Sequence, residues 1–410
     1  MFMFFGFAST VSLANPITPE EALQNVVKFL NAQPSEMKKV KGEYKTEKLT
    51  LVYTRKNQGE QNLFYVFNRA ENNGYVIASA DDCAESVLGY SEQGKFLPDQ
   101  LPCNMRWFLD SYAHQIEYAK QHGLQVKAIQ KAKRKTVKPL LETTWNQYEP
   151  YNNFCPIDTE TGERSIVGCV AVAQAQVMFY HRWPERGIGS HSYEWRGKKL
   201  SANFGNTVYQ WDKMKYNYER NDSDPNNAIA TLMYHCGISL EMNYNSYGSY
   251  ASISGEELFK YFGYADSYQF MWREDDPDAF EEALYDNISR DLPVLWGGQD
   301  LEIDEGHLFV CDGYKASNGT YHINWGWGGY NDGYFKITYL QADDDRNYTE
   351  DQFIITEIMP KTATSVDLET DFKSQETGRY SINGYRLLSP KSGINIIKMD
   401  DGTVKKEFVR

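Results

Sequence analysis

The chain has little that would commit it to a metal, a nucleic acid or a membrane. Its 410 residues include only six cysteines, without a CxxC pair, a dense disulfide pattern or zinc-ligand spacing. A zinc module and a disulfide-stapled fold are therefore not indicated. The net charge of −14 argues against a nucleic acid or an anionic membrane as partner. Beyond residue 14, no apolar run is long enough to span a bilayer. The sequence thus indicates no metal, no cofactor and no membrane span.

The first 14 residues are apolar and end in the small-x-small triplet Ser12-Leu13-Ala14. This pattern is typical of the apolar region and cleavage site of a secretory signal peptide, although the usual charged start is missing. We therefore predict a signal peptide at residues 1–14, with a buried N-terminal strand as the alternative.

A length of 410 residues favours two or three units. Residues 15–126 form the first. Thr18, Pro19 and Glu21 make a capping box with proline at the first helical position, and apolar residues follow at helical spacing. Strand-like runs lie at 49–53, 63–68 and 74–80, and a second amphipathic helix covers 105–116. We expect a small α+β domain without a catalytic set of its own.

Residues 127–138 are basic and polar. They are either a solvated helix face or linker, or an exposed junction at which the chain is cut.

Residues 139–361 make the main unit. Helical patterns at 170–183, 228–236 and 278–289 come first, and alternating strands at 306–314, 320–325 and 333–338 follow. A helical half followed by an antiparallel β half is an α+β architecture with a cleft available between the halves.

Residues 362–410 are polar up to Arg379 and then regain strand-like apolar content. We predict a tether followed by two short strands, detached from the main unit. An extra hairpin docked on that unit is the alternative.

The chemistry depends on three residues far apart in the chain. Cys169 opens a helical run, where unpaired N–H groups and the helix dipole favour a thiolate over a thiol. His307 lies in the strand-like run GHLFV, and Asn324 opens the run NWGWGG. Taken singly, each has an ordinary structural explanation: a buried thiol, a core histidine and a strand end. Their order of Cys, His and Asn is the one that a papain-type thiol protease needs.

These segments resemble the C10 family of secreted bacterial cysteine proteases, the streptopain-like proteases. The resemblance rests on 145–152 (WNQYEPYN), 168–181 (GCVA to YH), 306–310 (GHLFV) and 324–333 (NWGWGG to DG). It extends to the first unit, where GYVIAS at 74–79 and LGYS at 88–91 are similar to the inhibitory prodomain of the family. The C-terminal pattern from Ile382 resembles the short sorting tails of type IX secretion.

The resemblance implies a role for each site residue. It makes Cys169 the nucleophile, His307 the base, Asn324 the residue that orients the histidine, and Gln147 an oxyanion donor. Gly306, Trp325 and Trp327 would border the substrate groove, and Trp325 would shield the His–Asn contact from water. The segment 244–254 corresponds to the specificity wall of the family but diverges from it.

We therefore predict a papain-like two-subdomain cysteine protease preceded by a small α+β prodomain. It would be a secreted or cell-surface zymogen of an endopeptidase, a monomer acting on proteins or peptides and inhibited by its own prodomain. Two alternatives remain: a catalytically silent inhibitor or binding protein that retains the fold, and an acyl transferase with the same Cys–His chemistry.

Overall fold

The structure is a computed structural model that describes residues 15–33, 45–124, 134–218, 227–300, 305–337, 352–361, 376–381, 386–387, 389–391, 393–399 and 404–409. The predicted signal peptide lies outside the described residues, as do positions 127–133 of the basic segment and 362–375 of the predicted tether. The chain divides into two compact units, Met1–Pro360 and Lys361–Arg410.

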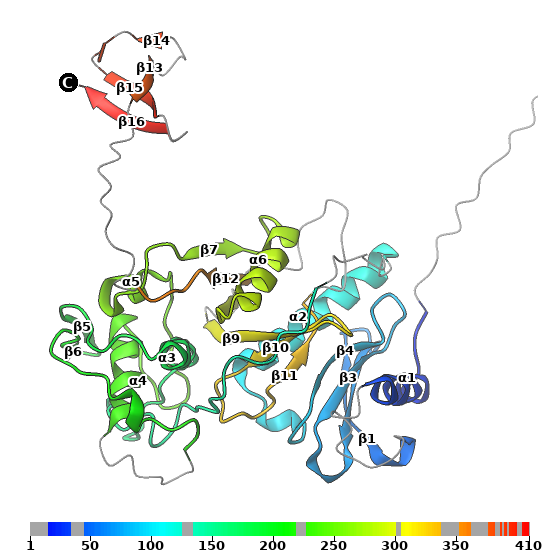
Figure 1. Cartoon of the computed structure of the whole chain (residues 1–410). Helices are drawn as coiled ribbons and strands as arrows, with labels where there is room; N and C mark the ends of the chain where they lie inside the picture. Colours follow the sequence, from blue (N-terminus) through cyan, green and yellow to red (C-terminus); the bar gives the residue numbers. More distant parts are fainter. Residues whose placement is uncertain are drawn as a thin grey trace, which may run out of the picture. The chain divides into compact units, whose positions relative to one another are not determined.

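The larger unit contains helices and strands along its whole described length (Figure 1). The helices are α1 (Pro19–Ala32), α2 (Cys103–His122), α3 (Cys169–His181), α4 (Ala228–Ser239), α5 (Glu256–Phe262) and α6 (Pro277–Ser289). The strands are β1 (Leu49–Lys56), β2 (Asn62–Arg69), β3 (Tyr75–Ser79), β4 (Val87–Ser91), β5 (His191–Trp195), β6 (Lys198–Ala202), β7 (Gln269–Trp272), β8 (Val294–Asp300), β9 (Glu305–Lys315), β10 (Thr320–Asn324), β11 (Gly333–Phe335) and β12 (Gln352–Thr356).

The first helix begins as its sequence predicts. The Thr18 side chain accepts a hydrogen bond from the Glu21 N–H at 3.2 Å, and the Glu21 carboxylate accepts one from the Thr18 N–H at 2.8 Å. This reciprocal capping satisfies two N–H groups that a helix start otherwise leaves unpaired. The three strands and the second helix expected before residue 126 are confirmed as β1, β2, β3 and α2.

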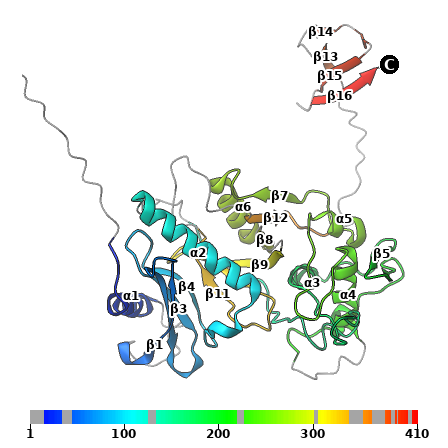
Figure 2. The same cartoon turned by 180° about the vertical axis from the view of Figure 1, so that it is seen from behind.

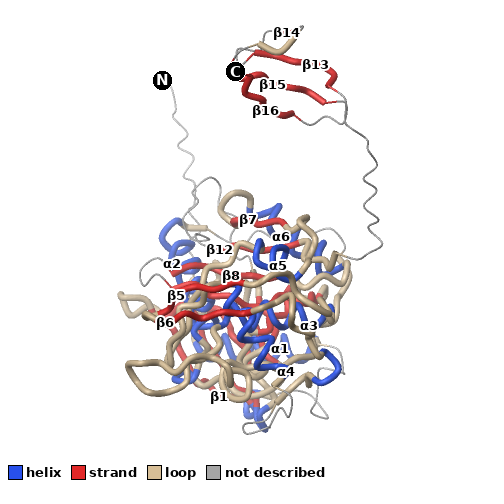
Figure 3. The backbone as a smooth tube through the Cα atoms, turned by 90° about the vertical axis from the view of Figure 1, so that its left-hand side faces the viewer, coloured by secondary structure: helices blue, strands red, loops and turns tan. Residues whose placement is uncertain are grey.

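Ten strands form one antiparallel sheet in the order β1-β2-β3-β4-β11-β10-β9-β8-β12-β7. Figure 3 shows several of them, among them β7, β8 and β12, running side by side. Strands β5 and β6 form a separate hairpin. The predicted α+β class, with a helical half and an antiparallel half, is confirmed.

The expected prodomain and the expected catalytic unit share this sheet. Strand β4 pairs with β11, with Tyr90 opposite Tyr334 and Gly89 opposite Phe335. An added Cβ at Gly89 would lie 2.7 Å from the Phe335 ring, so the close pairing needs glycine there. The expected boundary between the two units, at residues 127–138, therefore does not divide the sheet, which contains strands from both sides of it.

Each face of the sheet has its own core, because side chains alternate along a strand. Along β9, Leu308 and Val310 pack with α3 and α4, whereas Phe309 and Cys311 pack with α2 and α6. Helix α1 covers the part of the sheet made by β2, β3 and β4 on the face opposite α2. Figure 2 shows α2 lying across the sheet. Helix α2 of the expected prodomain thus packs on the strand that carries His307.

The smaller unit differs from its prediction. Its described residues form four strands rather than two, in the order β14 (Arg386–Leu387), β13 (Glu376–Ser381), β15 (Gly393–Met399) and β16 (Val404–Val409). Arg379 and Glu407 form an ion pair between β13 and β16. Strands rich in Lys, Glu and Arg give a weak sequence signal, and this is why two of the four were missed.

None of the helices in the described ranges has the length and apolar character that a bilayer span requires.

Candidate active site

The predicted nucleophile is the first residue of a buried helix. Helix α3 begins at Cys169, which is 6% exposed, and Gly168 before it has φ +92°. A Cβ at Gly168 would lie 2.9 Å from both the Ser249 carbonyl oxygen and the Met242 Cε atom. Glycine is therefore required for the turn that presents Cys169 at the helix N-terminus. All six cysteines are thiols, with no disulfide among them.

Gln147 lies beside this helix start with one half of its amide unused. Its Oε1 accepts a hydrogen bond from the Gly168 N–H at 3.1 Å, and its backbone carbonyl accepts one from the Val167 N–H at 3.0 Å. The side chain is buried, with 1% exposure, and its Nε2 has no hydrogen-bond partner among the residues that the structure describes. A buried amide N–H2 group without an acceptor is costly unless something else uses it. It is therefore a ready donor on a side chain that is bound to Gly168, the residue before Cys169.

The predicted base is placed by its backbone. His307 stands in β9 opposite Gly298 of β8, and Gly306 stands opposite Gln299. Helix α3 packs against β9. The side chain of His307 lies outside the described residues, so its contacts with Cys169 and Asn324 stay predictions.

Asn324 is the last residue of β10 and is 3% exposed. Its Oδ1 accepts hydrogen bonds from Gln176 Nε2 and from the Gly326 N–H, each at 3.0 Å. Its Nδ2 donates to the Thr143 carbonyl at 2.8 Å. Both ordinary acceptor positions of Oδ1 are thus occupied. A bond from the His307 imidazole to this oxygen would take the place of the one from Gly326 or share the oxygen as a third donor.

The two groove tryptophans have different environments. Trp325 is fully buried, and its ring packs 5.6 Å from Phe108 of the prodomain helix α2 and 4.8 Å from Phe309. A residue that borders a substrate groove should be exposed to it, but in this structure helix α2 covers Trp325. Trp327 is partly exposed and its ring lies 6.3 Å from that of Tyr148, which is 49% exposed.

A single prodomain amide contacts the backbone next to two predicted site residues. Asn104 of α2 is fully buried, and its Nδ2 donates to the Leu308 carbonyl at 3.2 Å and to the Trp325 carbonyl at 2.9 Å. Leu308 follows His307, and Trp325 follows Asn324. The expected prodomain therefore bonds to the backbone directly after the predicted base and directly after its expected partner.

A cluster of ionisable groups lies near the junction of β4 and β11. Burial raises the pKa of Asp332 to about 7, although its bond from the Trp325 N–H acts in the opposite direction. Burial also disfavours a charged His322, but the Asp312 carboxylate, 2.6 Å from its Nδ1, outweighs this and raises the pKa of His322. The Ser91 hydroxyl of β4 donates to the Asp332 carbonyl at 2.7 Å. The backbone of Asp332 therefore joins β4 to the loop before β11, while its carboxyl group accepts a hydrogen bond from the Trp325 N–H.

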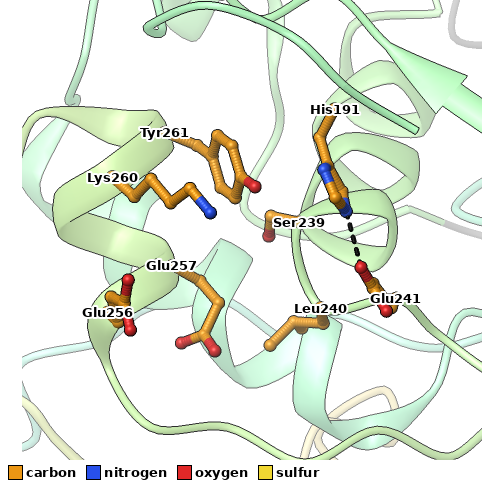
Figure 4. Close-up of a pocket in the computed structure, with 8 residues that line it drawn as sticks. All are labelled: His191, Ser239, Leu240, Glu241, Glu256, Glu257, Lys260 and Tyr261. Carbon is orange, nitrogen blue, oxygen red and sulfur yellow. Dashed lines mark hydrogen bonds and ion pairs between the residues drawn. The ribbon is translucent and has the colours of Figure 1, made fainter. Parts of the chain in front are cut away.

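A polar pocket of about 280 Å³ lies away from these residues, between β5, α5 and the end of α4 (Figure 4). His191 Nε2 and Glu241 Oε1 lie 2.9 Å apart there, with Glu256, Glu257 and Lys260 around them. It contains none of the predicted site residues.

The sequence left several contacts of this site unpredicted. Gln176 lies two helical turns after Cys169, on the same face of α3, and this spacing was its only signal. Asn104 and Thr143 carry no local pattern that distinguishes them from ordinary polar residues.

Comparison with known proteins matches two parts of the chain to families. Residues 145–335 match the peptidase C10 family, and residues 14–116 match the Spi protease inhibitor family. Streptopain from Streptococcus pyogenes is 34% identical over 299 residues, which are 67% of this chain and 74% of streptopain. The thiol protease/hemagglutinin PrtT from Porphyromonas gingivalis is 30% identical over 376 residues, 85% of this chain. The chain spans only 42% of the length of PrtT.

A solved structure agrees with both the fold and the extent of the match. The prointerpain A fragment from Prevotella intermedia superposes with a TM-score of 0.67 and is 33% identical in sequence. The match covers 77% of this chain and all of that fragment.

Proposed function

The chain belongs to the peptidase C10 family, and on this premise we propose that it is the zymogen of a papain-like cysteine endopeptidase. Cys169 is the nucleophile, His307 the base, and Asn324 holds the histidine. Residues 15–126, which overlap the match to the Spi protease inhibitor family at 14–116, are the inhibitory prodomain. The substrates are proteins or peptides.

One observation carries the proposal: the side-chain NH2 group of Gln147, which has no partner among the described residues, lies on a side chain that bonds to the start of the Cys169 helix. In the reaction, the Cys169 thiolate attacks the carbonyl carbon of a peptide bond, and the carbonyl oxygen becomes an oxyanion. The Gln147 Nε2–H group and the Cys169 backbone N–H stabilise that charge. A donor without a ground-state partner has no hydrogen bond to give up when the oxyanion forms.

His307 handles the protons. As an imidazolium it protonates the leaving amine when the C–N bond breaks, which leaves an acyl thioester on Cys169. As a neutral imidazole it then takes a proton from water, and the resulting hydroxide attacks the thioester. Collapse of the second oxyanion releases the acid and restores the thiolate–imidazolium pair.

The prodomain inhibits through the strands of the site. Asn104 bonds to the carbonyls that follow His307 and Asn324, and Phe108 covers Trp325. These contacts act on β9 and β10 rather than on the mouth of the groove, which supports inhibition by displacement of the His307 segment. Trp325, Trp327 and Gly306 then border the substrate groove after the prodomain leaves.

Export and maturation complete the proposal. Residues 1–14 are a signal peptide, residues 127–138 contain or adjoin the processing site, and residues 362–410 are a tether with a sorting tail. The enzyme is secreted or held at the cell surface, and it acts as a monomer.

The test is incubation of the purified full-length chain with denatured casein, with and without a thiol reductant. We expect reductant-dependent cleavage of casein and shortening of the chain by about its first 130 residues, the length of the prodomain and linker. His307→Ala should be inactive and Asn324→Ala partly active, because Asn324 need not exchange a proton. A chain that titrates with a thiolate-selective epoxide but never cleaves casein would favour an acyl transferase. A chain that does neither would favour the silent inhibitor.

A further inference from the structure

Three buried residues close a ring of hydrogen bonds between the two halves of the catalytic unit. The Thr143 hydroxyl donates to Gln176 Oε1 at 2.6 Å, Gln176 Nε2 donates to Asn324 Oδ1 at 3.0 Å, and Asn324 Nδ2 donates to the Thr143 carbonyl at 2.8 Å. The three residues are at most 3% exposed. Each comes from a different segment: the loop before Gln147, the helix of Cys169 and the end of β10.

The helix in this ring is the one that carries the nucleophile. Gln176 follows Cys169 by seven residues, so the two side chains lie on one face of α3, about two turns apart. Val172, between them on that face, approaches Gly326, whose φ is +73° and whose added Cβ would lie 3.0 Å from Val172 Cγ1. One face of α3 therefore carries Cys169, supports the loop after Asn324 and binds the Asn324 amide.

The ring also determines which way the Asn324 amide faces. Its oxygen receives N–H groups from Gln176 and Gly326, and its nitrogen faces the Thr143 carbonyl. An amide held from both ends by buried partners has one favourable orientation, because a flip would oppose like groups at both ends. The orientation of Asn324 is thus set by the helix and the loop, independently of His307.

We propose that Gln176 is a positioning residue for catalysis, which holds Asn324, and through it His307, at a fixed place relative to Cys169. The inference rests on the proposed function of Cys169, His307 and Asn324. Gln176 touches neither substrate nor the reacting atoms. It acts by joining the helix of the nucleophile to the strand end that orients the base.

The chain offers a matched control on the same helix. Gln174 is as fully buried as Gln176, but among the described residues its Nε2 has a single partner, the Ser239 hydroxyl, at a long 3.4 Å. It lies two residues away and therefore on another side of α3. Gln174→Met and Gln176→Met remove the same atoms from the same helix, and only the second opens the ring.

The experiment compares the unaltered chain with the variants, each produced at full length. All are matured by the same tagged sample of active enzyme, and that enzyme is removed through its tag before the assay. For Gln176→Met we expect kcat to fall by about 10- to 100-fold with KM within about 2-fold, the effect of a small misplacement of reacting groups. Alkylation of Cys169 by iodoacetamide at about pH 6, where only a thiolate held by an imidazolium reacts fast, should slow by a similar factor. Gln174→Met should stay within about 2-fold of the unaltered enzyme in both measurements.

A second pair of variants covers the case in which Gln176→Met does not fold. Thr143→Val removes the hydroxyl from the ring and Thr143→Ser keeps it. The proposal is supported if kcat and the alkylation rate of Cys169 fall in Thr143→Val and both stay near the unaltered values in Thr143→Ser. Equal values for the two Thr143 variants, or equal losses in folded Gln174→Met and Gln176→Met, overturn it.

Failure of the proposed function gives a different result. If the unaltered chain hydrolyses nothing, the assignment of a protease is wrong. The role of Gln176 is then tested by alkylation without any hydrolysis assay. Equal alkylation rates of Cys169 in the unaltered chain and in Gln176→Met refute it.

Discussion

The two ends of the Gln147 amide allow a prediction that separates an effect on kcat from an effect on the stability of the fold. Gln147→Ala removes both ends of the amide: the Nε2 donor and the Oε1 that accepts the Gly168 N–H at 3.1 Å. Gln147→Glu keeps an acceptor for Gly168 but replaces the donor with a second oxygen. When ionised, this new carboxylate repels an oxyanion. When protonated, it has one O–H to offer.

The magnitudes follow from these two losses. Removal of one oxyanion donor lowers kcat by roughly 10²–10³-fold, or about 2.7–4 kcal/mol in the barrier. The alanine variant also leaves the Gly168 N–H without an acceptor in a buried place, which costs about 1–3 kcal/mol in the free energy of unfolding. The glutamate variant avoids that cost but buries an ionisable group. Its residual activity should rise as the pH falls, because only the protonated carboxyl can donate.

The assay measures kcat on a peptide substrate from about pH 5 to about pH 8, the range in which a buried carboxyl titrates, together with thermal unfolding and the alkylation rate of Cys169. Because Gln147 acts on the oxyanion, alkylation should stay within about 3-fold of the unaltered enzyme while kcat falls. Gln174→Ala, at a buried glutamine of α3, is the control. An unchanged kcat would remove Gln147 from the site. An equal loss of alkylation and kcat would show that Gln147 only supports the helix start.

Four further predictions concern the nucleophile, the prodomain, the junction and the tail. Cys169→Ser should abolish hydrolysis with unchanged thermal unfolding, and near-normal activity on casein would refute the assignment. Asn104→Ala should weaken prodomain binding by about 1–3 kcal/mol, since it removes two hydrogen bonds, so the uncut chain should hydrolyse a peptide measurably. An unchanged lag before activity would contradict this. The pKa of Asp332 is raised from 3.8 to about 7. The free energy of unfolding should therefore fall as the pH rises from about 4 to about 7, by at most roughly 4 kcal/mol. Asp332→Asn should remove this dependence in melting curves at pH 5 and 8, and an equal slope would argue against it. Truncation after Lys361, at the boundary between the two compact units, should leave kcat unchanged, whereas lost solubility would indicate a docked tail.

Local features of the fold could be predicted because their causes lie a few residues apart. The start of α1 follows from Thr18 and Glu21, whose reciprocal bonds span three residues. The start of α3 at Cys169 follows from glycine before an apolar helical run. The weakest predictions were strands with many charged residues, such as β13 and β16, where apolar alternation is faint.

The sheet junction could not be predicted in the same way. Strands β4 and β11 are separated by more than 200 residues, and nothing in either strand specifies its neighbour. Which two strands pair depends on which strand edges the packed helices leave uncovered. This in turn depends on how α1, α2 and α6 pack together. The closeness of the prodomain to the catalytic strands was therefore visible only in three dimensions.

The amino-acid sequence by itself determined the chemical types at the site: a thiol at a helix start, and a histidine and an asparagine in later strands. Short-range periodicity and capping carry that information. Only the tertiary structure decided what the polar groups bind. Gln176 and Asn324 are 148 residues apart, and Asn104 and Leu308 are 204 apart. An amide has no preferred partner along the chain, so its hydrogen bonds are chosen when packing excludes water and brings distant donors and acceptors together.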